Sequence, residues 1–196
     1  MTYQDKCTET LLKAKILLRE NDWNFISNNN NILLESKVFP DICAVPCFRT
    51  TTTVNKTIDY LMNSLWNETE EDRKKEDPDI IAWSCIQSEP TFRVCTQINK
   101  MQWPLWSRET VYVQMKVIEN DASWFITFSI DHDAVPLKPT LYVRALIHLS
   151  IYKFSIENGQ TRVHRMSHID PSGNIPSSII TLYAGKLCKP LIEWKK

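Results

Sequence analysis

The sequence predicts an α+β fold in which a curved antiparallel sheet is covered by a helix at the C-terminus. Three observations support it: β-rich runs over residues 141–150 and 162–168, the turn-forming residues 170–176, and a single final helix after them. Long antiparallel strands that end in a turn and continue into one helix describe a sheet with a lid. We therefore expect an internal cavity between the sheet and this helix.

The N-terminal part of the chain predicts a helix followed by a hairpin. Leucine and isoleucine side chains give residues 8–21 an apolar face, which is typical of an amphipathic helix. Residues 23–27 and 32–39 have strand-like composition, and the four asparagines at 28–31 favour a turn between them. Residues 44–49 predict the next strand.

A second helix is predicted by apolar residues spaced at i, i+4, i+7, i+8 and i+11, with Thr52 or Thr53 as its N-cap. These apolar residues are Val54, Ile58, Leu61, Met62 and Leu65. Residues 68–77 follow as a charged run of both signs. We expect this run to form a solvated loop or a surface helical turn rather than a binding element.

The main sheet is predicted from six further strands. They cover residues 80–87, 92–100, 109–119, 124–130, 141–154 and 160–169. Their connections are short and polar, whereas parallel pairing needs a helical crossover. We therefore expect an antiparallel meander.

The final helix has Pro176 in its first turn and one apolar stripe. The stripe consists of Ile180, Tyr183, Leu187, Leu191 and Trp194. Pro190 lacks a backbone donor and should kink the helix or end it one turn early, and Gly185 loosens the same region. Such a soft point would allow a lid to open, although two irregularities of purely structural origin explain the pattern equally well.

Composition narrows the classes of function. A chain of 196 residues predicts one domain, and 23 Lys+Arg against 23 Asp+Glu leave no basic field for nucleic acid. Three glycines argue against phosphate-binding glycine-rich loops. Six irregularly placed cysteines, without a signal peptide or an apolar run of about 18 residues, predict a reduced cytoplasmic protein. We expect a monomer without a cofactor.

Five pieces of the sequence, in this order and spacing, resemble the START family, the steroidogenic acute regulatory protein-related lipid-transfer domains. They are Trp23, Leu65-Trp-Asn67, Pro104-Leu-Trp-Ser-Arg-Glu-Thr-Val-Tyr112, Val143-Arg144 and Asp170-Pro-Ser-Gly-Asn-Ile-Pro176 with the residues up to 180. The resemblance covers nearly the whole chain. It implies a helix-grip fold, in which the sheet wraps the C-terminal helix around a tunnel for one lipid. It also implies non-enzymatic binding of that lipid and its transfer between membranes.

The chain departs from the family's pattern at positions that matter for the ligand. Asn67 stands where the family has an aspartate. Gln97 and Thr110 replace two aromatics of the cage that holds choline in the family's phosphatidylcholine carrier. Cys95 and Gln114 replace the ion pair of its sterol carriers. We therefore expect a polar, uncharged head-group end and a neutral or zwitterionic lipid, such as a phospholipid, a sterol or a related lipid.

The family's inward-facing parity predicts the lining, because side chains on a strand alternate between its faces. Asn99 would share the inward face of its strand. The predicted ligand-binding residues are Cys95, Gln97, Thr110, Tyr112, Gln114, Ser129, Arg144, Ile180, Tyr183 and Leu187.

Three other polar features have simpler structural explanations. Arg108 and Arg144 each open a strand, and pairing with a carboxylate such as Glu109 is favoured over contact with a head-group phosphate. Asp170 is expected to shape its turn by accepting hydrogen bonds from nearby backbone donors.

A metal site is not expected from His164, His168, Cys43 and Cys47. On a strand that rises about 3.3 Å per residue, two histidines four residues apart are roughly 13 Å apart and cannot share an ion.

Two loops are candidates for contact with a membrane surface. Trp103 and Trp106 flank Pro-Leu and would either plug the core or lie at a membrane interface. Residues 132–140 resemble the family's mobile loop over the tunnel mouth, although a rigid proline-shaped connection is an equal alternative. The mechanism we expect is transient peripheral docking by this loop and the final helix over 176–194, opening of the lid, uptake of lipid and closure.

Two other classes of function remain open. Enzymes occur on related grip-like folds, and a cyclase or hydrolase would use Tyr112, Asp131 and His132 as acid or base. A lipid-sensing or scaffold domain would hold lipid without moving it, and would bind a protein through the surface around Trp103 and Trp106.

Overall fold

The structure is a computed structural model that describes residues 2–173 and 175–196. Helix α1 (Tyr3–Arg19) begins five residues before the predicted start. The reason is a capping box: the Thr2 hydroxyl accepts from the Asp5 amide at 3.1 Å, and the Asp5 carboxylate accepts from the Thr2 amide at 2.9 Å. The predicted hairpin is confirmed as β1 (Asn24–Asn29) and β2 (Ile32–Phe39). Asn30 and Asn31 turn between them at positive φ, which asparagine tolerates.

Strand β3 (Cys43–Val54) extends well beyond the predicted residues 44–49. It pairs with β2 on one side and β10 on the other, so that Thr51 faces both Leu33 and His164. Thr52 and Thr53, which were expected to cap the next helix, therefore lie within β3. Helix α2 (Ile58–Trp66) is instead capped by Thr57, whose hydroxyl accepts from the Tyr60 amide at 3.2 Å.

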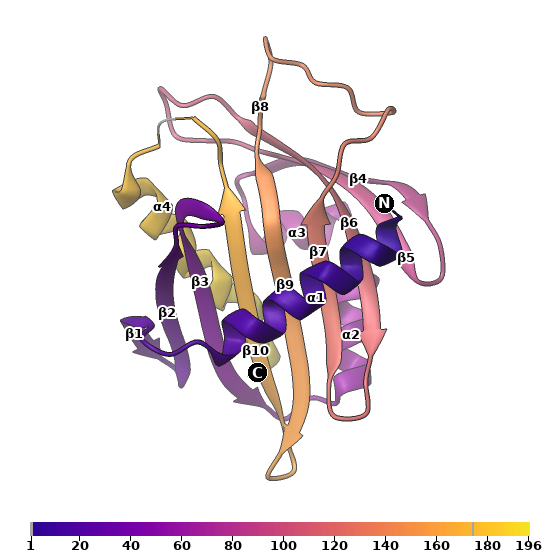
Figure 1. Cartoon of the computed structure of the whole chain (residues 1–196), viewed down its shortest axis with the longest axis vertical. Helices are drawn as coiled ribbons and strands as arrows, with labels where there is room; N and C mark the ends of the chain where they lie inside the picture. The colour runs from indigo at the N-terminus through magenta and orange to yellow at the C-terminus, as the bar shows by residue number, and fades with distance from the viewer. Residues whose placement is uncertain (1, 174) are drawn as a thin grey trace.

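The charged run contains helix α3 (Glu70–Glu76), which Thr69 and Asp72 begin with a second capping box. The strands that follow are β4 (Ile80–Ser88), β5 (Phe92–Asn99), β6 (Arg108–Ile118), β7 (Ser123–Ser129), β8 (Val143–Arg144), β9 (Leu146–Glu157) and β10 (Gln160–Asp170). The described strands other than β8 follow the order β1-β2-β3-β10-β9-β7-β6-β5-β4 in one sheet (Figure 1). Strands β4, β5, β6, β7, β9 and β10 are successive antiparallel neighbours, which confirms the meander expected of the main sheet.

One predicted strand is divided. Residues 141–154 were expected to be continuous, but the chain changes neighbours at Ala145. Before it, β8 pairs in parallel with β6 through Arg108 and Val143; after it, β9 lies antiparallel between β7 and β10. The division arises because no single strand can pair with β6 and also lie beyond β7.

The predicted terminal helix is also divided, into α4 (Ser177–Ala184), a 3-10 turn η1 (Gly185–Cys188) and α5 (Lys189–Trp194). Pro176 is the N-cap rather than part of the first turn. The break starts at Gly185, before Pro190, because Pro190 occupies the first turn of α5, where a missing amide donor costs nothing.

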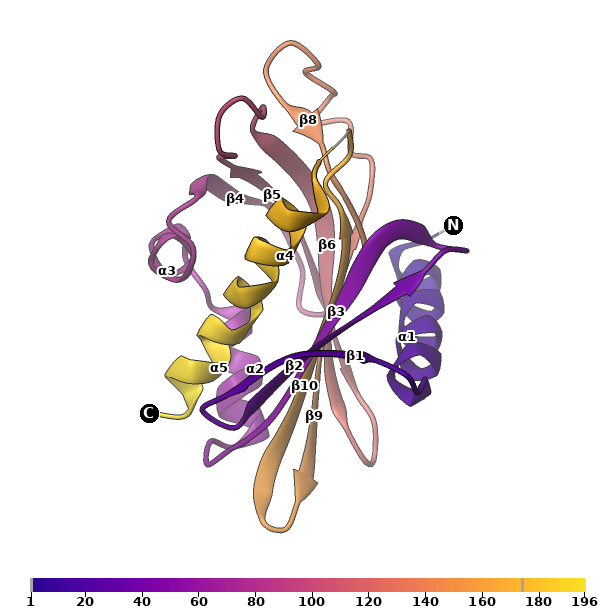
Figure 2. The same ribbon diagram turned by 90° about the vertical axis from the view of Figure 1, so that its left-hand side faces the viewer.

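The helices cover opposite faces of the sheet. Figure 2 shows α1 on one side and the C-terminal helical segments on the other, together with α2 and α3. On the first side, α1 packs on a core that includes Val113, Ile126 and Leu149. On the second, Phe154, Leu191 and other apolar side chains form a separate core around α2 and α5. The space left between the sheet and α4 is the cavity.

Candidate functional site

A cavity of about 320 Å³ lies between the concave face of the sheet and the C-terminal helical segments. This is at the lower end of the range of about 300 to 1,000 Å³ that is usual for small-molecule sites. Part of its wall is apolar. That part includes Leu65, Ile80, Met101, Phe125, Ile147, Ile179, Ile180 and Leu187. A second hollow, about 390 Å³, adjoins it at Met101, Ile179, Tyr183 and Lys186.

Seven of the ten predicted site residues line this cavity. They are Gln97, Thr110, Tyr112, Gln114, Ile180, Tyr183 and Leu187, and Asn99 lies with them. Strand β6 shows why: Thr110, Tyr112 and Gln114 face the cavity, whereas Val111 and Val113 alternate with them and pack under α1.

Three predicted residues lie outside the lining, each for a local reason. Cys95 has the expected parity but is fully buried against Tyr112 and Trp83. Ser129 accepts a hydrogen bond from the Ile147 amide at 2.8 Å, so it fixes the start of β9. Arg144 pairs with Glu109.

Tyr112 is one of the polar residues that line the cavity, and its hydroxyl makes two hydrogen bonds. Its hydroxyl accepts from Trp83 Nε1 at 2.8 Å and donates to Gln97 Oε1 at 3.5 Å. Burial raises the pKa of Tyr112 to about 12. The phenol is therefore neutral at physiological pH and offers a hydrogen bond rather than a charge.

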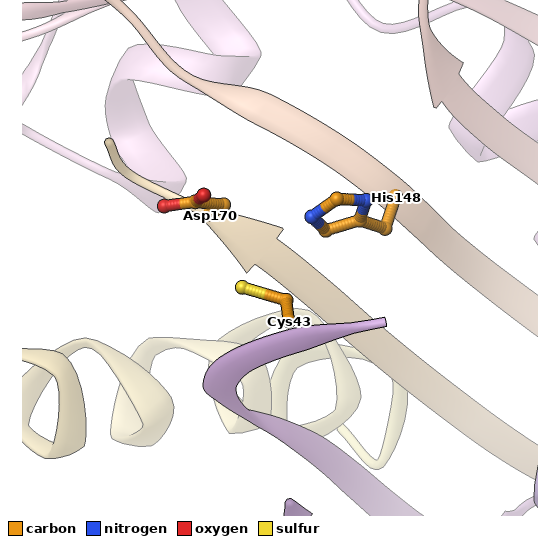
Figure 3. Close-up of side chains that lie close together, drawn as sticks. All are labelled: Cys43, His148 and Asp170. Carbon is orange, nitrogen blue, oxygen red and sulfur yellow. The ribbon is translucent and has the colours of Figure 1, made fainter. Parts of the chain in front are cut away.

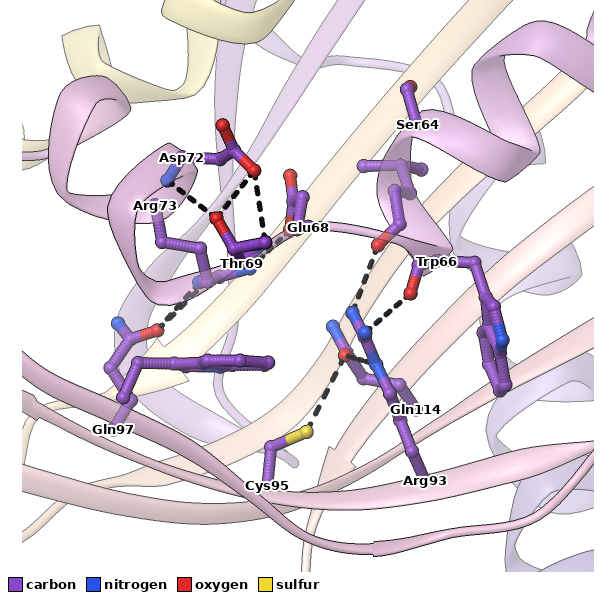
Figure 4. Close-up of polar contacts among 12 residues, drawn as sticks. Ser64, Trp66, Glu68, Thr69, Asp72, Arg73, Arg93, Cys95, Gln97 and Gln114 are labelled. Carbon is purple, nitrogen blue, oxygen red and sulfur yellow. Dashed lines mark hydrogen bonds and ion pairs between the residues drawn. The ribbon is translucent and has the colours of Figure 1, made fainter.

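Arg73 of α3 brings charge to this wall. Its guanidinium bonds Glu68 Oε2 at 2.7 Å and Gln97 Oε1 at 2.9 and 3.2 Å (Figure 4). The Glu68 and Arg73 side chains are only 11% and 22% exposed. Residues 70–76 thus form a surface helix, which was one of the two expected forms, and none of them is fully buried. The expectation that the run takes no part in a binding site is not observed, because α3 packs beside β4 and the Glu68 and Arg73 side chains line the cavity.

Arg93, also shown in Figure 4, supports the cavity wall by binding the side chain of the lining residue Gln114. It is 4% exposed, and it donates to Gln114 Oε1 at 2.7 Å and to the carbonyls of Leu65 and Trp66 at 2.9 and 2.6 Å. Those carbonyls end helix α2, where a cation is favourable. Arg93 thus joins the helix end to the side chain of Gln114.

Arg165 and Glu76 add two charges that have no direct ion-pair partner among the described residues. Arg165 donates to the Leu187 carbonyl at 2.9 Å, while its Nε is buried and makes no hydrogen bond within the described part of the chain. Burial, followed by the nearby Glu68 carboxylate, raises the pKa of Glu76. In total, three carboxylates and four cationic side chains line the cavity, so the expected uncharged head-group end is not observed.

Ion pairs and carbonyl contacts fix the C-terminal helical segments and the connection before them at two points. Lys186 of η1 pairs with Asp77 at 2.7 Å and with Asp79 at 2.5 Å. Arg108 donates to the carbonyls of Pro171 and Ser172 at 2.7 and 2.9 Å, and to that of Trp106. Arg108 therefore binds the connection to α4 instead of the expected carboxylate.

Comparison with known proteins agrees with this architecture. A family model described as the START domain matches residues 3–189. The chain belongs to the START domain family. A search of curated proteins found no match.

Solved structures similar to this START domain are distant in sequence and close in fold. Human StAR-related lipid transfer protein 5 is 16% identical, with a TM-score of 0.76, over 99% of this chain and 96% of that one. Human STARD10 is 16% identical, with a TM-score of 0.74, over 96% and 76%. A STAR-related lipid transfer protein fragment from Xanthomonas axonopodis is 18% identical, with a TM-score of 0.72, over 89% and 97%. These likenesses establish the helix-grip fold.

Two neighbouring connections of the START domain expose large apolar side chains. Trp103 is 90% exposed and Trp106 is 53% exposed, so neither plugs the core. Leu137 and Leu141, in the connection between β7 and β8, are 67% and 58% exposed. The two connections meet where the Val143 amide donates to the Ser107 carbonyl at 3.0 Å.

The candidate acid and base residues are not brought together. Tyr112 lies on the cavity wall, whereas Asp131 and His132 lie in the connection after β7 and outside the lining.

Arg144 and Glu109 form the predicted ion pair at 2.8 Å, with both side chains nearly buried. In the described part of the chain, no helix is long and apolar enough to span a bilayer.

The sequence contained a signal for some of the cavity charges but not for all. Val163, Arg165 and Ser167 follow one another at two-residue spacing and share the inward face of β10, so parity could have placed Arg165 there. Nothing in the run 68–77 distinguishes Arg73 and Glu76 from the solvated charges beside them. Their position depends on how α3 packs against β4.

Proposed function

We propose that this START domain binds one lipid in the cavity and transfers it between membranes without catalysing a reaction. The observation that supports this most is the cavity between the sheet and α4, whose lining combines apolar and polar side chains. An apolar ligand can leave a bilayer for such a cavity because one apolar environment replaces another. Two of the similar structures are also named as lipid transfer proteins.

The lining supports a neutral or zwitterionic lipid. Cations and carboxylates are nearly balanced in number, so a strongly anionic or cationic head group would meet like charges as well as opposite ones. We propose that Gln97, Thr110, Tyr112, Gln114, Ile180, Tyr183 and Leu187 contact the ligand. Arg165 is added to this set because its buried Nε lacks a partner among the described residues and can donate to a head-group oxygen.

The route to a membrane runs through the exposed apolar connections. Trp103, Trp106, Leu137 and Leu141 form a surface of the kind that inserts at a bilayer interface. The 3-10 turn at Gly185–Cys188 interrupts the helical lid, and Lys186 holds it closed through Asp77 and Asp79. We propose peripheral docking by the exposed surface and opening at this turn, in a cytoplasmic monomer.

A vesicle-to-vesicle transfer assay tests the proposal. Donor vesicles carry phosphatidylcholine, phosphatidylserine or cholesterol with a label, and acceptor vesicles carry none. We expect protein-dependent transfer of a neutral or zwitterionic lipid. Arg165→Gln should weaken binding of a phospholipid by about tenfold to a hundredfold, which is the value of one hydrogen bond to a charged group. Arg162→Gln, on the exposed end of the same strand, is the matched control.

Each outcome separates the alternatives. Stoichiometric binding without transfer would identify a sensor or scaffold. Preferred transfer of phosphatidylserine would contradict the argument from balanced charge. Equal losses in Arg165→Gln and Arg162→Gln would contradict the place given to Arg165.

A further inference from the structure

Three side chains with metal-ligating atoms converge outside the lipid cavity. Cys43 begins β3, His148 lies on β9, and Asp170 ends β10. Their ligand atoms lie within 4.8 Å of one another, and each residue is partly buried. Figure 3 shows the His148 ring directed at the space between the Cys43 sulfur and the Asp170 carboxylate. Among the His, Cys, Asp and Glu side chains of the described residues, these three lie close enough together to share one metal ion.

A β-bulge directs His148 to this position. In the ladder between β9 and β10, His168 faces Leu149 and Ile169 faces Ile147, so His148 is the extra residue between them. Bulges re-aim a side chain at the cost of regular pairing and often accompany functional sites. Here the bulge leaves His148 Nε2 buried and without a hydrogen-bond partner in the described part of the chain. A buried ring nitrogen of this kind is costly unless it has a ligand.

The other two ligands are oriented by the backbone. The Ser172 amide donates to Asp170 Oδ1 at 2.8 Å, and the Val45 amide donates to Cys43 Sγ at 3.4 Å. The first bond fixes the carboxylate in its turn, as the sequence predicted. The second holds the sulfur in place at the start of β3. Outer contacts of this kind hold ligands in place at metal sites.

We propose that Cys43, His148 and Asp170 bind one divalent transition-metal ion, with zinc preferred. Thiolate, imidazole and carboxylate together suit zinc, and three protein ligands leave a fourth position for water. On binding, a sulfur–zinc bond replaces the sulfur–hydrogen bond of Cys43, and the proton goes to solvent. The two anions balance the ion's charge, with Lys13 of α1 the nearby cation.

Only small movements close the site. Ligand atoms around a tetrahedral zinc ion lie roughly 3.5 Å apart. Side-chain movements of about 1 Å therefore bring the three ligand atoms to this separation. The ion would join the starts of β3 and β9 to the end of β10. Because the connection to α4 follows Asp170, the ion would also hold the base of the helical lid.

Titration of the purified, reduced full-length protein with Co²⁺ and then Zn²⁺ tests the site. We expect one Co²⁺ per chain, with the near-ultraviolet charge-transfer band of a cobalt–thiolate bond, which one equivalent of Zn²⁺ removes. Cys43→Ser should abolish the band. His148→Gln and Asp170→Asn should each weaken binding at least tenfold. Cys85→Ser removes an exposed thiol outside the group and serves as the matched control.

X-ray absorption of the zinc-loaded wild-type chain supplies a test that does not depend on how the variants fold. We expect one sulfur at about 2.3 Å and nitrogen or oxygen ligands at about 2.0 to 2.1 Å. A shell without sulfur, a shell with two sulfurs, or loss of the band in Cys85→Ser with retention in Cys43→Ser would overturn the proposal. So would absence of stoichiometric binding to the wild-type chain.

Discussion

Replacing Arg93 with lysine should destabilise the whole domain, although the charge is conserved. Arg93 is 4% exposed and serves three acceptors at once: Gln114 Oε1 and the carbonyls of Leu65 and Trp66. A guanidinium reaches all three because its donors form a planar fork. A lysine ammonium at the same position remains buried but can serve only one of them well.

The magnitude follows from the bonds that are lost. Each hydrogen bond to a charged group contributes about 1.5 to 3 kcal/mol. Losing two would cost about 3 to 6 kcal/mol, and partial rearrangement around the ammonium lowers this to about 3 kcal/mol. Most small domains have a total stability of only about 5 to 15 kcal/mol, so the effect should be easy to measure.

Urea denaturation at neutral pH, followed by tryptophan fluorescence, measures the free energy of unfolding. Arg162→Lys is the matched control, because Arg162 pairs with Glu157 at the surface and both side chains are well exposed. The control should change stability by less than about 0.5 kcal/mol. A loss below about 1 kcal/mol in Arg93→Lys would refute the reasoning that the fork anchors the end of α2.

Three further predictions concern pH, packing and membrane contact. Burial, with the nearby Arg162 cation, lowers the pKa of His164 from 6.5 to about 4. Between these two pH values the unfolded chain binds more protons than the folded chain, so the free energy of unfolding falls as the pH drops from about 6.5 to about 4. At pH 5 the loss of stability is about 2 kcal/mol, worked from 1.36 kcal/mol per pKa unit. Urea titrations at pH 7 and pH 5 measure this loss, and His164→Gln should remove it. Equal pH dependence in the wild type and in His164→Gln would contradict this. Leu191→Ala empties a fully buried position and should cost about 2 to 5 kcal/mol by denaturation, against less than about 0.5 for exposed Ile16→Ala; similar losses would be inconsistent with the core. Trp103→Ser should weaken co-sedimentation with vesicles without changing the unfolding midpoint, and unchanged co-sedimentation would exclude this loop as a contact.

Local patterns predicted the elements of the sheet well. The alternation of polar and apolar residues along β6 is a two-residue period that places Thr110, Tyr112 and Gln114 on one face, and the resemblance to the START family implied that this face points inward. The asparagine turn before Ile32 was predictable for the same kind of local reason: few other residues tolerate positive φ.

Features that depend on distant contacts were not predictable. Cys95 has the correct parity, but whether it reaches the cavity depends on Trp83 of the next strand. Arg73 is partly buried only because α3 packs beside β4. The group formed by Cys43 and His148 depends on a bulge, and a one-residue insertion in a ladder leaves no periodic mark in the sequence.

The claim that the cavity holds one lipid is tested most directly by native mass spectrometry after incubation with vesicles of a total lipid extract. Ile147 lines the cavity, so the larger side chain in Ile147→Trp should fill part of the space that a lipid would occupy. Ile156→Trp is the matched control, because Ile156 lies on the same strand but is 64% exposed. We predict one lipid per chain in the wild type and in Ile156→Trp, and an empty chain in folded Ile147→Trp. A wild-type chain that stays empty, or a lipid that is retained equally in Ile147→Trp, would contradict the account.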